Sequence, residues 1–270
     1  MLDGREDQAA GLRRLFRRAP PQVVALYAGG QGGARNAALA AHRIAGQAER
    51  VLVLDEAEGD GTLAAALGVD EGADLLQLLD GHSTLSRIVQ PVPGLVGRVP
   101  VAAAALALPL LDSARRACLV EALRILHRHA GFVLVHASAA TALAPSPFVQ
   151  AAPRRLVLAE ASASGATDAY QTIKGLAGAG AGSVHVAVCR ARGRADAEAF
   201  FRSLETLVRR HVGVPLAWLG ELERDDIAAG LREPLELAHA EAGAAFLRRI
   251  GALAGGTNPR GGAFGTRVRP

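Results

Sequence analysis

Continuous apolar runs recur along the chain and are separated by longer amphipathic segments. The runs are short, are rich in Val, Leu and Ala, and predict strands at residues 23–27, 51–55, 132–136, 156–159, 183–189 and 217–219. Most of them are apolar throughout instead of alternating, which is typical of strands covered by helices on both faces of a sheet. The pattern therefore indicates a buried sheet.

Segments with a helical spacing of apolar positions fall between the predicted strands. They cover residues 34–48, 73–79, 112–129, 165–177, 195–211 and 235–254. This repeated β-α order predicts an α/β fold with a doubly wound, mostly parallel sheet flanked by helices. Because ligands of such sheets bind at the carboxyl ends of the strands, we expect functional residues where the predicted strands end.

Both ends of the chain differ from the α/β domain, which we assign to residues 21–254. Residues 5–18 place apolar side chains near one helix face and arginines on the other, and two prolines follow. Residues 1–20 are therefore predicted to form a separate short amphipathic helix. Residues 255–270 are rich in Gly and Arg, which predicts a flexible tail.

The composition favours a cytosolic protein with one large core. The chain has 270 residues, of which 50% are hydrophobic and only 4% aromatic, so Ala, Leu and Val must fill the core. The longest uncharged apolar stretch, residues 99–111, contains two prolines and is too short to span a bilayer. The N-terminus is charged where a signal peptide is apolar. Two cysteines, Cys118 and Cys189, make no disulfide framework.

The net charge of +4 comes almost entirely from arginine, since Lys174 is the only lysine. Arginines cluster at residues 13–18 and 190–194 and in the tail. A basic patch can bind nucleic acid or acidic lipid, but few aromatic residues accompany these clusters. We interpret them as solvated basic faces, and we do not expect a nucleic-acid partner.

A glycine-rich stretch at residues 27–36 follows the first predicted strand and precedes an Ala-rich helix. This is the place of a phosphate-binding loop, in which backbone N–H groups at a helix N-terminus hold phosphate. The ordinary loop, G-x-x-x-x-G-K-[ST], adds a lysine for the phosphates and a hydroxyl for Mg²⁺. Here Arg35 and Asn36 stand at those two places. An ordinary Gly-rich turn is the alternative interpretation.

Several blocks of sequence resemble the MinD/ParA family of P-loop ATPases and, within it, the FlhG regulators of flagellar number. Residues 7–13, DQAAGLR, are similar to the segment that opens FlhG proteins, and residues 167–174, TDAYQTIK, are similar to a helix of that family. Residues 51–55, 74–100 and 212–226 follow further family blocks, the second with the spacing of a short helix and a strand. The resemblance extends to about residue 254.

The resemblance implies a degenerate nucleotide site. An early lysine of the family falls at Gly30, the late glycine at Ala34, the lysine at Arg35 and the Ser/Thr at Asn36. A left-handed Ala34 would cost about 1–2 kcal/mol. The residues that the resemblance assigns to nucleotide binding are Gly29, Gly30, Gly32, Gly33, Ala34, Arg35, Asn36 and Asp55.

Three further family positions have lost their usual residues. The water-orienting aspartate falls at Ala57, the Walker B aspartate at His136 and the adenine-reading asparagine at Cys189, while Glu56 and Glu58 are expected to point elsewhere. We expect no catalytic residue, no metal ligands, and weak or lost binding of Mg-ATP or ADP. The alternative is an active ATPase switch in which Arg35 replaces the lysine. His136 and Cys189 could approach each other, but no third metal ligand accompanies them.

The resemblance also implies a partner for the N-terminal segment. In FlhG proteins the matching segment docks on the signal-recognition-type GTPase FlhF and stimulates GTP hydrolysis. The residues assigned to this contact are Asp7, Gln8, Leu12 and Arg13; packing of the helix on its own domain is the alternative. Flagellar switch or regulatory proteins are further expected partners.

The family often carries a C-terminal membrane-targeting helix, and residues 246–250 are the candidate here. Glycine and arginine follow them, so we assign these residues to the last helix of the domain. Membrane association is expected to be weak or absent, with a peripheral position at the membrane or cell pole as the alternative to a purely cytoplasmic one.

Overall fold

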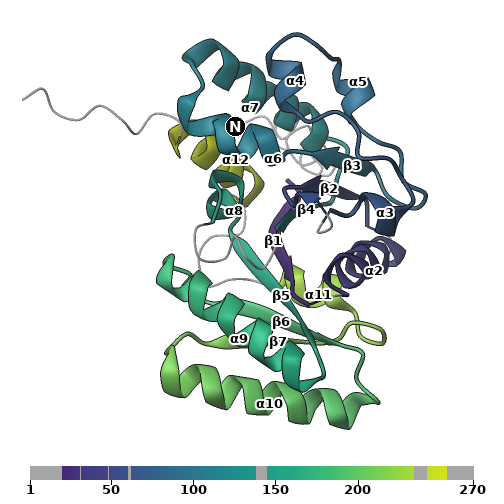
Figure 1. The fold of residues 1–270 in the computed structure, drawn as a ribbon, viewed down its shortest axis with the longest axis vertical. Helices are drawn as coiled ribbons and strands as arrows, with labels where there is room; N and C mark the ends of the chain where they lie inside the picture. Colours follow the sequence, from purple (N-terminus) through teal and green to yellow (C-terminus); the bar gives the residue numbers. More distant parts are fainter. Residues whose placement is uncertain are drawn as a thin grey trace, which may run out of the picture.

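The computed structural model describes residues 20–30, 32–47, 49–59, 62–137, 145–233 and 242–253. Within these ranges seven strands form one sheet, in the order β3-β2-β4-β1-β5-β6-β7, and every neighbouring pair is parallel (Figure 1). The strands are β1 (Gln22–Ala28), β2 (Val51–Asp55), β3 (Gly97–Pro100), β4 (Phe132–Ala137), β5 (Arg154–Glu160), β6 (Val184–Cys189) and β7 (Leu216–Glu221). The predicted α/β fold with a parallel, doubly wound sheet is confirmed.

Helices cover both faces of this sheet. One face carries α2 (Gly33–Gly46), α3 (Ala64–Leu67) and α11 (Ile227–Arg232). The other face carries α4 (Leu76–Leu79), α5 (Leu85–Ile88), α6 (Ala102–Ala107), α7 (Ser113–His127), α8 (Pro147–Ala151), α9 (Ala163–Gly178), α10 (Arg194–His211) and α12 (Ala242–Leu253), with a 3₁₀ turn, η2 (Leu108–Leu110), between α6 and α7. Strand β1 shows the division, because Val23, Ala25 and Tyr27 face the second layer and the residues between them face the first.

The six strands predicted from apolar runs are all present, with ends that differ by at most a few residues. Strand β3 was expected only from the family spacing of residues 74–100, because its four residues include a glycine, an arginine and a proline. Among the helices, the short elements α3, α5, α6, α8 and α11 were not predicted, and the segment expected at 73–79 is helical only from Leu76. There the Asp74 carboxylate accepts a hydrogen bond from the Leu76 N–H at 2.8 Å and ends the preceding loop. The predicted N-terminal helix and tail lie outside the described residues.

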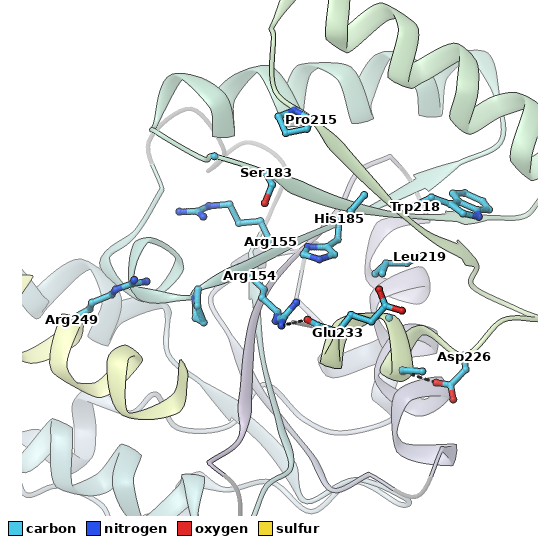
Figure 2. Close-up of a pocket in the computed structure, with 15 residues that line it drawn as sticks. Arg154, Arg155, Ser183, His185, Pro215, Trp218, Leu219, Asp226, Glu233 and Arg249 are labelled. Atoms are coloured by element: carbon cyan, nitrogen blue, oxygen red, sulfur yellow. Dashed lines mark hydrogen bonds between the residues drawn. The ribbon is translucent and has the colours of Figure 1, made fainter. Parts of the chain in front are cut away.

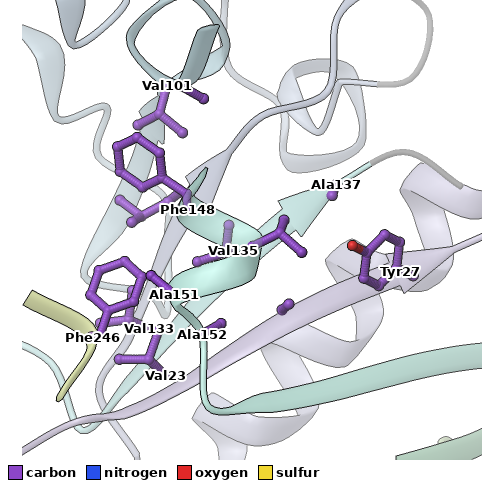
Figure 3. Packing of buried hydrophobic residues seen from close by; sticks show 14 of the residues in the cluster. Val23, Tyr27, Val101, Val133, Val135, Ala137, Phe148, Ala151, Ala152 and Phe246 are labelled. Carbon is purple, nitrogen blue, oxygen red and sulfur yellow. The ribbon is translucent and has the colours of Figure 1, made fainter. Parts of the chain in front are cut away.

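Helix α12 belongs to the hydrophobic core. Phe246 and Ile250 are fully buried, and the Phe246 ring lies 5.4 Å from the ring of His127 and 6.4 Å from that of Phe148 (Figure 3). These apolar side chains are therefore used inside the domain, as expected for the last domain helix. In the part of the chain that the structure describes, no helix is long and apolar enough to cross a membrane.

In two strand-to-helix turns a glycine lies close to the backbone carbonyl at the end of the preceding strand. A Cβ at Gly33 would lie 2.4 Å from the carbonyl oxygen of Ala28, and a Cβ at Gly165 would lie 2.3 Å from that of Glu160. In both turns the glycine follows the last residue of the strand by five positions and stands at or near the start of the helix. Glycine is required there because any side chain would meet backbone that cannot move aside.

Candidate functional site

The glycine-rich loop that connects β1 to α2 is short. Gly30 has a positive φ of 79°, a conformation that favours glycine, and the Gly33 N–H donates to its carbonyl oxygen at 3.1 Å. Helix α2 begins at Gly33, one residue before the predicted start, and the Asn36 N–H donates to the carbonyl oxygen of Gly32 at 2.9 Å. The loop therefore turns immediately into a helix that is packed against the end of its own strand.

Ala34 does not have the left-handed conformation that the sequence comparison suggested. It is the second residue of α2, and among the described residues only Arg190 combines a side chain with a positive φ. The cost of about 1–2 kcal/mol that a left-handed Ala34 would carry therefore does not arise. The left-handed position of the loop is Gly30, and the tight packing falls on Gly33.

The two residues that replace the lysine and the hydroxyl lie differently. Arg35 is exposed on α2, and no hydrogen bond or ion pair joins its side chain to another described residue. Asn36 is 7% exposed and lies beneath the loop, with its Nδ2 3.6 Å from the position that a Cβ would take at Gly32. The charge of Arg35 is thus present near the loop but is not fixed there by the surrounding described residues.

Two carboxylates stand close to the glycine loop. Asp168 on α9 places Oδ2 3.3 Å from the position of a Cβ on Gly30, and Glu160 at the end of β5 places Oε2 3.8 Å from that position on Gly32. Arg190 lies at the same distance from Gly32 and pairs with Glu160 at 3.7 Å. Of these two carboxylates, only Glu160 forms an ion pair with a described residue. The negative charge of Asp168 therefore opposes a phosphate group.

Asp55 ends β2 and is buried with all of its acceptor positions in use. From the described residues its Oδ1 accepts hydrogen bonds from the Nδ1 of His136 at 2.8 Å and from the N–H of Ala57 at 3.4 Å. Its Oδ2 accepts from the Nε of Arg98 at 2.7 Å and from the N–H of Leu63 at 2.8 Å. The side chain is fully buried. Each oxygen thus serves two donors inside the protein, and none of its lone pairs points to solvent.

Arg98 on β3 is the cationic partner of this carboxylate, and sequence analysis did not identify it. It is 1% exposed and completes its hydrogen bonds with the carbonyl oxygens of Asp70 and Glu71, the side-chain oxygen of Gln90 and the carboxylate of Glu71. The available signal was an arginine inside the apolar run Val96–Val101. A buried arginine needs a buried anion, which Asp55 supplies.

The pKa of Asp55 reflects these contacts. Burial by itself would raise it, but the hydrogen bond and charge of His136, the Leu63 N–H and the charge of Arg98 together lower the pKa below its usual 3.8. Asp55 is therefore ionised in the folded protein at every pH near neutrality. Its contribution to stability is present above its unfolded pKa and is lost only as the pH falls through the lowered folded value.

Glu56 was expected to point elsewhere, and its side chain is buried against Ser146. Its side chain is 8% exposed, and both of its carboxylate oxygens accept from the hydroxyl of Ser146, at 2.6 and 2.7 Å. Burial raises its pKa to about 7, the Ser146 hydroxyl opposes the rise, and the negative charge of Asp55 adds to it. The site thus contains a carboxyl group that takes up protons near neutral pH. Glu58, by contrast, is exposed as expected.

The remaining substituted positions do not assemble into a reactive group. Ala57 is buried beside Asp55. Burial, with the negative charges of Glu223 and Glu160, raises the pKa of the Cys189 thiol to about 12, which leaves it as an inert thiol. β1 and β5 lie between the strands of His136 and Cys189, so the sheet order does not make them neighbours. No cluster of metal-ligating side chains occurs within the described residues.

No family model matches this chain, and no curated protein matches it in sequence. Solved structures do match. A ParA family ATPase from Chlorobium tepidum is similar over 86% of this chain and 99% of its own, with 15% identity and a TM-score of 0.50. The fold is that of the MinD/ParA P-loop NTPases. At this level of identity the likeness shows the fold alone.

Two other solved structures are similar at somewhat lower scores. The MinC:MinD cell division complex of Aquifex aeolicus matches with 18% identity over 88% of this chain and 97% of that one, at a TM-score of 0.49. An ATP complex of McdA from Cyanothece matches with 17% identity over 90% and 99% of the two chains, at a TM-score of 0.47.

The close approach at Gly33 predicts a contrast between the two ends of α2. Gly33→Ala should lower the free energy of unfolding by about 1–3 kcal/mol, because the new methyl group meets the Ala28 carbonyl. Gly46→Ala, at the other end of the helix, meets nothing within 4 Å and should be neutral or stabilising by up to about 1 kcal/mol. Urea unfolding of the two variants checks this; equal effects would contradict it.

Glu56 predicts a pH dependence of stability. The unfolded state loses its proton near pH 4.5 and the folded state near pH 7, so the folded state binds more protons between these values. The free energy of unfolding should therefore fall as the pH rises through this window, by about 3 kcal/mol at most. The protonation of Asp55 changes the free energy of unfolding only below this window, because its pKa is lowered.

The measurement is urea unfolding at several pH values between 4 and 8, on the natural protein and two variants. Glu56→Gln should flatten the fall and raise stability near pH 8, since the neutral amide can still accept from Ser146. The matched control is Glu58→Gln on the neighbouring exposed side chain, which should keep the fall. A fall that persists unchanged in Glu56→Gln would assign the dependence to another group.

Proposed function

We propose that this protein is a regulator of the MinD/ParA type whose nucleotide cleft no longer holds Mg-ATP tightly, and that it acts as an FlhG-like regulator of flagellar number. The observation that supports the first part is the complete internal use of Asp55. Its fold supports a relation to this class of ATPases, and its site residues do not fit the cofactor.

The metal side of the cleft argues against Mg²⁺. This ion needs oxygen ligands in near-octahedral geometry and is usually held by one or two carboxylates. The carboxylate of Asp55 already accepts hydrogen bonds from Arg98 and His136, and the guanidinium only 2.7 Å away opposes a second cation. His136 stands at the other family position for a carboxylate. Binding Mg²⁺ here would require breaking a buried ion pair.

The phosphate side of the cleft argues in the same direction. Backbone N–H groups of the loop and the start of α2 remain, which by themselves favour an anion. The carboxylates of Glu160 and Asp168 lie beside the glycines, however, and the Arg35 side chain is exposed. Attraction from the helix terminus is therefore opposed by the nearest side chains.

Calorimetric titration with Mg-ATP tests this proposal. We expect no saturable binding at micromolar concentrations, for the natural protein and for Arg35→Ala alike. Arg210→Ala, on the exposed last turn of α10, serves as the control for removing one arginine. Micromolar binding that Arg35→Ala abolishes and Arg210→Ala retains would overturn the proposal and establish the alternative, an ATPase switch that uses arginine in place of lysine.

We further propose that residues 7–13 act on the signal-recognition-type GTPase FlhF, in the cytoplasm and at the cell pole. The support is the sequence resemblance of Asp7, Gln8, Leu12 and Arg13 to the segment that opens FlhG proteins; these residues lie outside the described part. An amide can position a water, and an arginine can stabilise the charge that develops on a transferring phosphate.

The GTPase rate of purified FlhF, measured with the full-length protein, tests this partner. The natural protein should stimulate the rate, and Gln8→Ala should lose most of the stimulation. Gln77→Ala changes an exposed glutamine on α4 and should keep it. Absence of stimulation by the natural protein would reject FlhF as the partner, and this outcome is independent of the Mg-ATP titration.

A further inference from the structure

A pocket opens at the edge of the sheet opposite the glycine loop. It has a volume of about 920 Å³ and lies at the amino ends of β5, β6 and β7, between α11 and the Arg249 side chain of α12 (Figure 2). This volume falls in the range of small-molecule sites in proteins. None of the nucleotide-site residues lines it.

Two buried polar side chains in this pocket each keep one atom without a hydrogen-bond partner among the described residues. Arg154 is 6% exposed; its Nη2 donates to the carbonyl oxygen of Glu233 at 2.7 Å, but its Nη1 has no hydrogen-bond partner. His185 is also 6% exposed, and its Nδ1 has no partner. Leaving a buried donor unsatisfied is costly, so folded proteins rarely do so without a ligand or water to complete it.

Three arginines line the pocket. Arg154 and Arg155 are consecutive residues of β5 and point to opposite faces of the sheet, so Arg155 neighbours Arg249 of α12 while Arg154 bonds to Glu233. Within the described residues none of the three arginines forms an ion pair. Burial lowers the pKa of Arg155, Tyr27 opposes this, and the positive charge of Arg249 lowers the pKa further. Two neighbouring arginines without a carboxylate between them are stabilised by an added anion.

The acidic residues of the pocket do not pair with these arginines. Asp226 is the N-cap of α11 and accepts a hydrogen bond from the Ala229 N–H at 2.8 Å. Glu233 contributes its backbone carbonyl to Arg154, and the charge of its carboxylate acts on His185. Pro215 and Leu219 add apolar surface for the remainder of a ligand.

We propose that this pocket binds a small organic phosphate, with its phosphate group held by Arg155 and Arg249 and its polar remainder held by Arg154 and His185. The planar guanidinium fork suits paired hydrogen bonds to phosphate oxygens. The phosphate would separate the two neighbouring arginines, and an acceptor atom elsewhere in the ligand would satisfy Arg154 Nη1. His185 Nδ1 would pair with another polar atom of the ligand. The protein would then sense a phosphorylated metabolite at the edge of the sheet far from the nucleotide cleft.

Calorimetric titration of the full-length protein tests this site, with phenyl phosphate, pyrophosphate and inorganic phosphate as probes. At least one of them should bind with a Kd of about 1 mM or less, and the binding should weaken as the salt concentration rises. Arg155→Gln and Arg249→Gln should each raise this Kd about tenfold or more, because each removes a charged hydrogen bond. Arg154→Met removes the buried arginine, and if this variant folds its Kd should also rise.

Two control variants show whether the phosphate probes bind in this pocket. Arg209→Gln removes an exposed arginine of α10 that does not line the pocket and should leave the Kd unchanged. Arg35→Ala separates this pocket from the glycine loop and should also leave the Kd unchanged. Absence of saturable binding by all three probes would overturn the proposal. So would binding that Arg155→Gln and Arg249→Gln leave intact, or binding that Arg35→Ala abolishes.

Discussion

The ion pair of Asp55 with Arg98, completed by His136, joins the ends of three neighbouring strands and organises this edge of the sheet. β2, β3 and β4 each contribute one of the three side chains, and the start of α3 adds a backbone N–H. Breaking such a buried pair by removing one partner typically costs about 3–5 kcal/mol, since the other charge stays buried and unpaired. This edge of the sheet is thus stabilised by contacts among the described residues.

This ion pair also accounts for the side chains around it. One oxygen of Asp55 is held by the guanidinium of Arg98, and the histidine at position 136 donates to the other. Glu56 is buried beside this negative charge and keeps a proton to about pH 7. The glycine loop retains its shape because Gly33 lets α2 approach β1, a packing role that does not require a bound phosphate.

Two buried polar clusters of the sheet differ in how their groups are satisfied. At the carboxyl edge, Asp55 and Arg98 are each 1% exposed and are saturated by internal contacts. At the amino edge, Arg154 and His185 are each 6% exposed and keep an atom without a hydrogen-bond partner among the described residues. The first cluster is therefore complete without a ligand and the second is not.

The sequence by itself determined six of the seven strands, the alternation of β and α, and the glycines of the first turn, because apolar periodicity and glycine spacing depend on local burial and backbone shape. It did not determine the partners of buried polar groups. Asp55 meets Arg98 from 43 residues away and His136 from 81, and Arg155 at the start of β5 meets Arg249 only through the packing of α12. Periodicity shows that a residue is buried, but only the tertiary structure decides which charge or hydrogen-bond donor lies opposite.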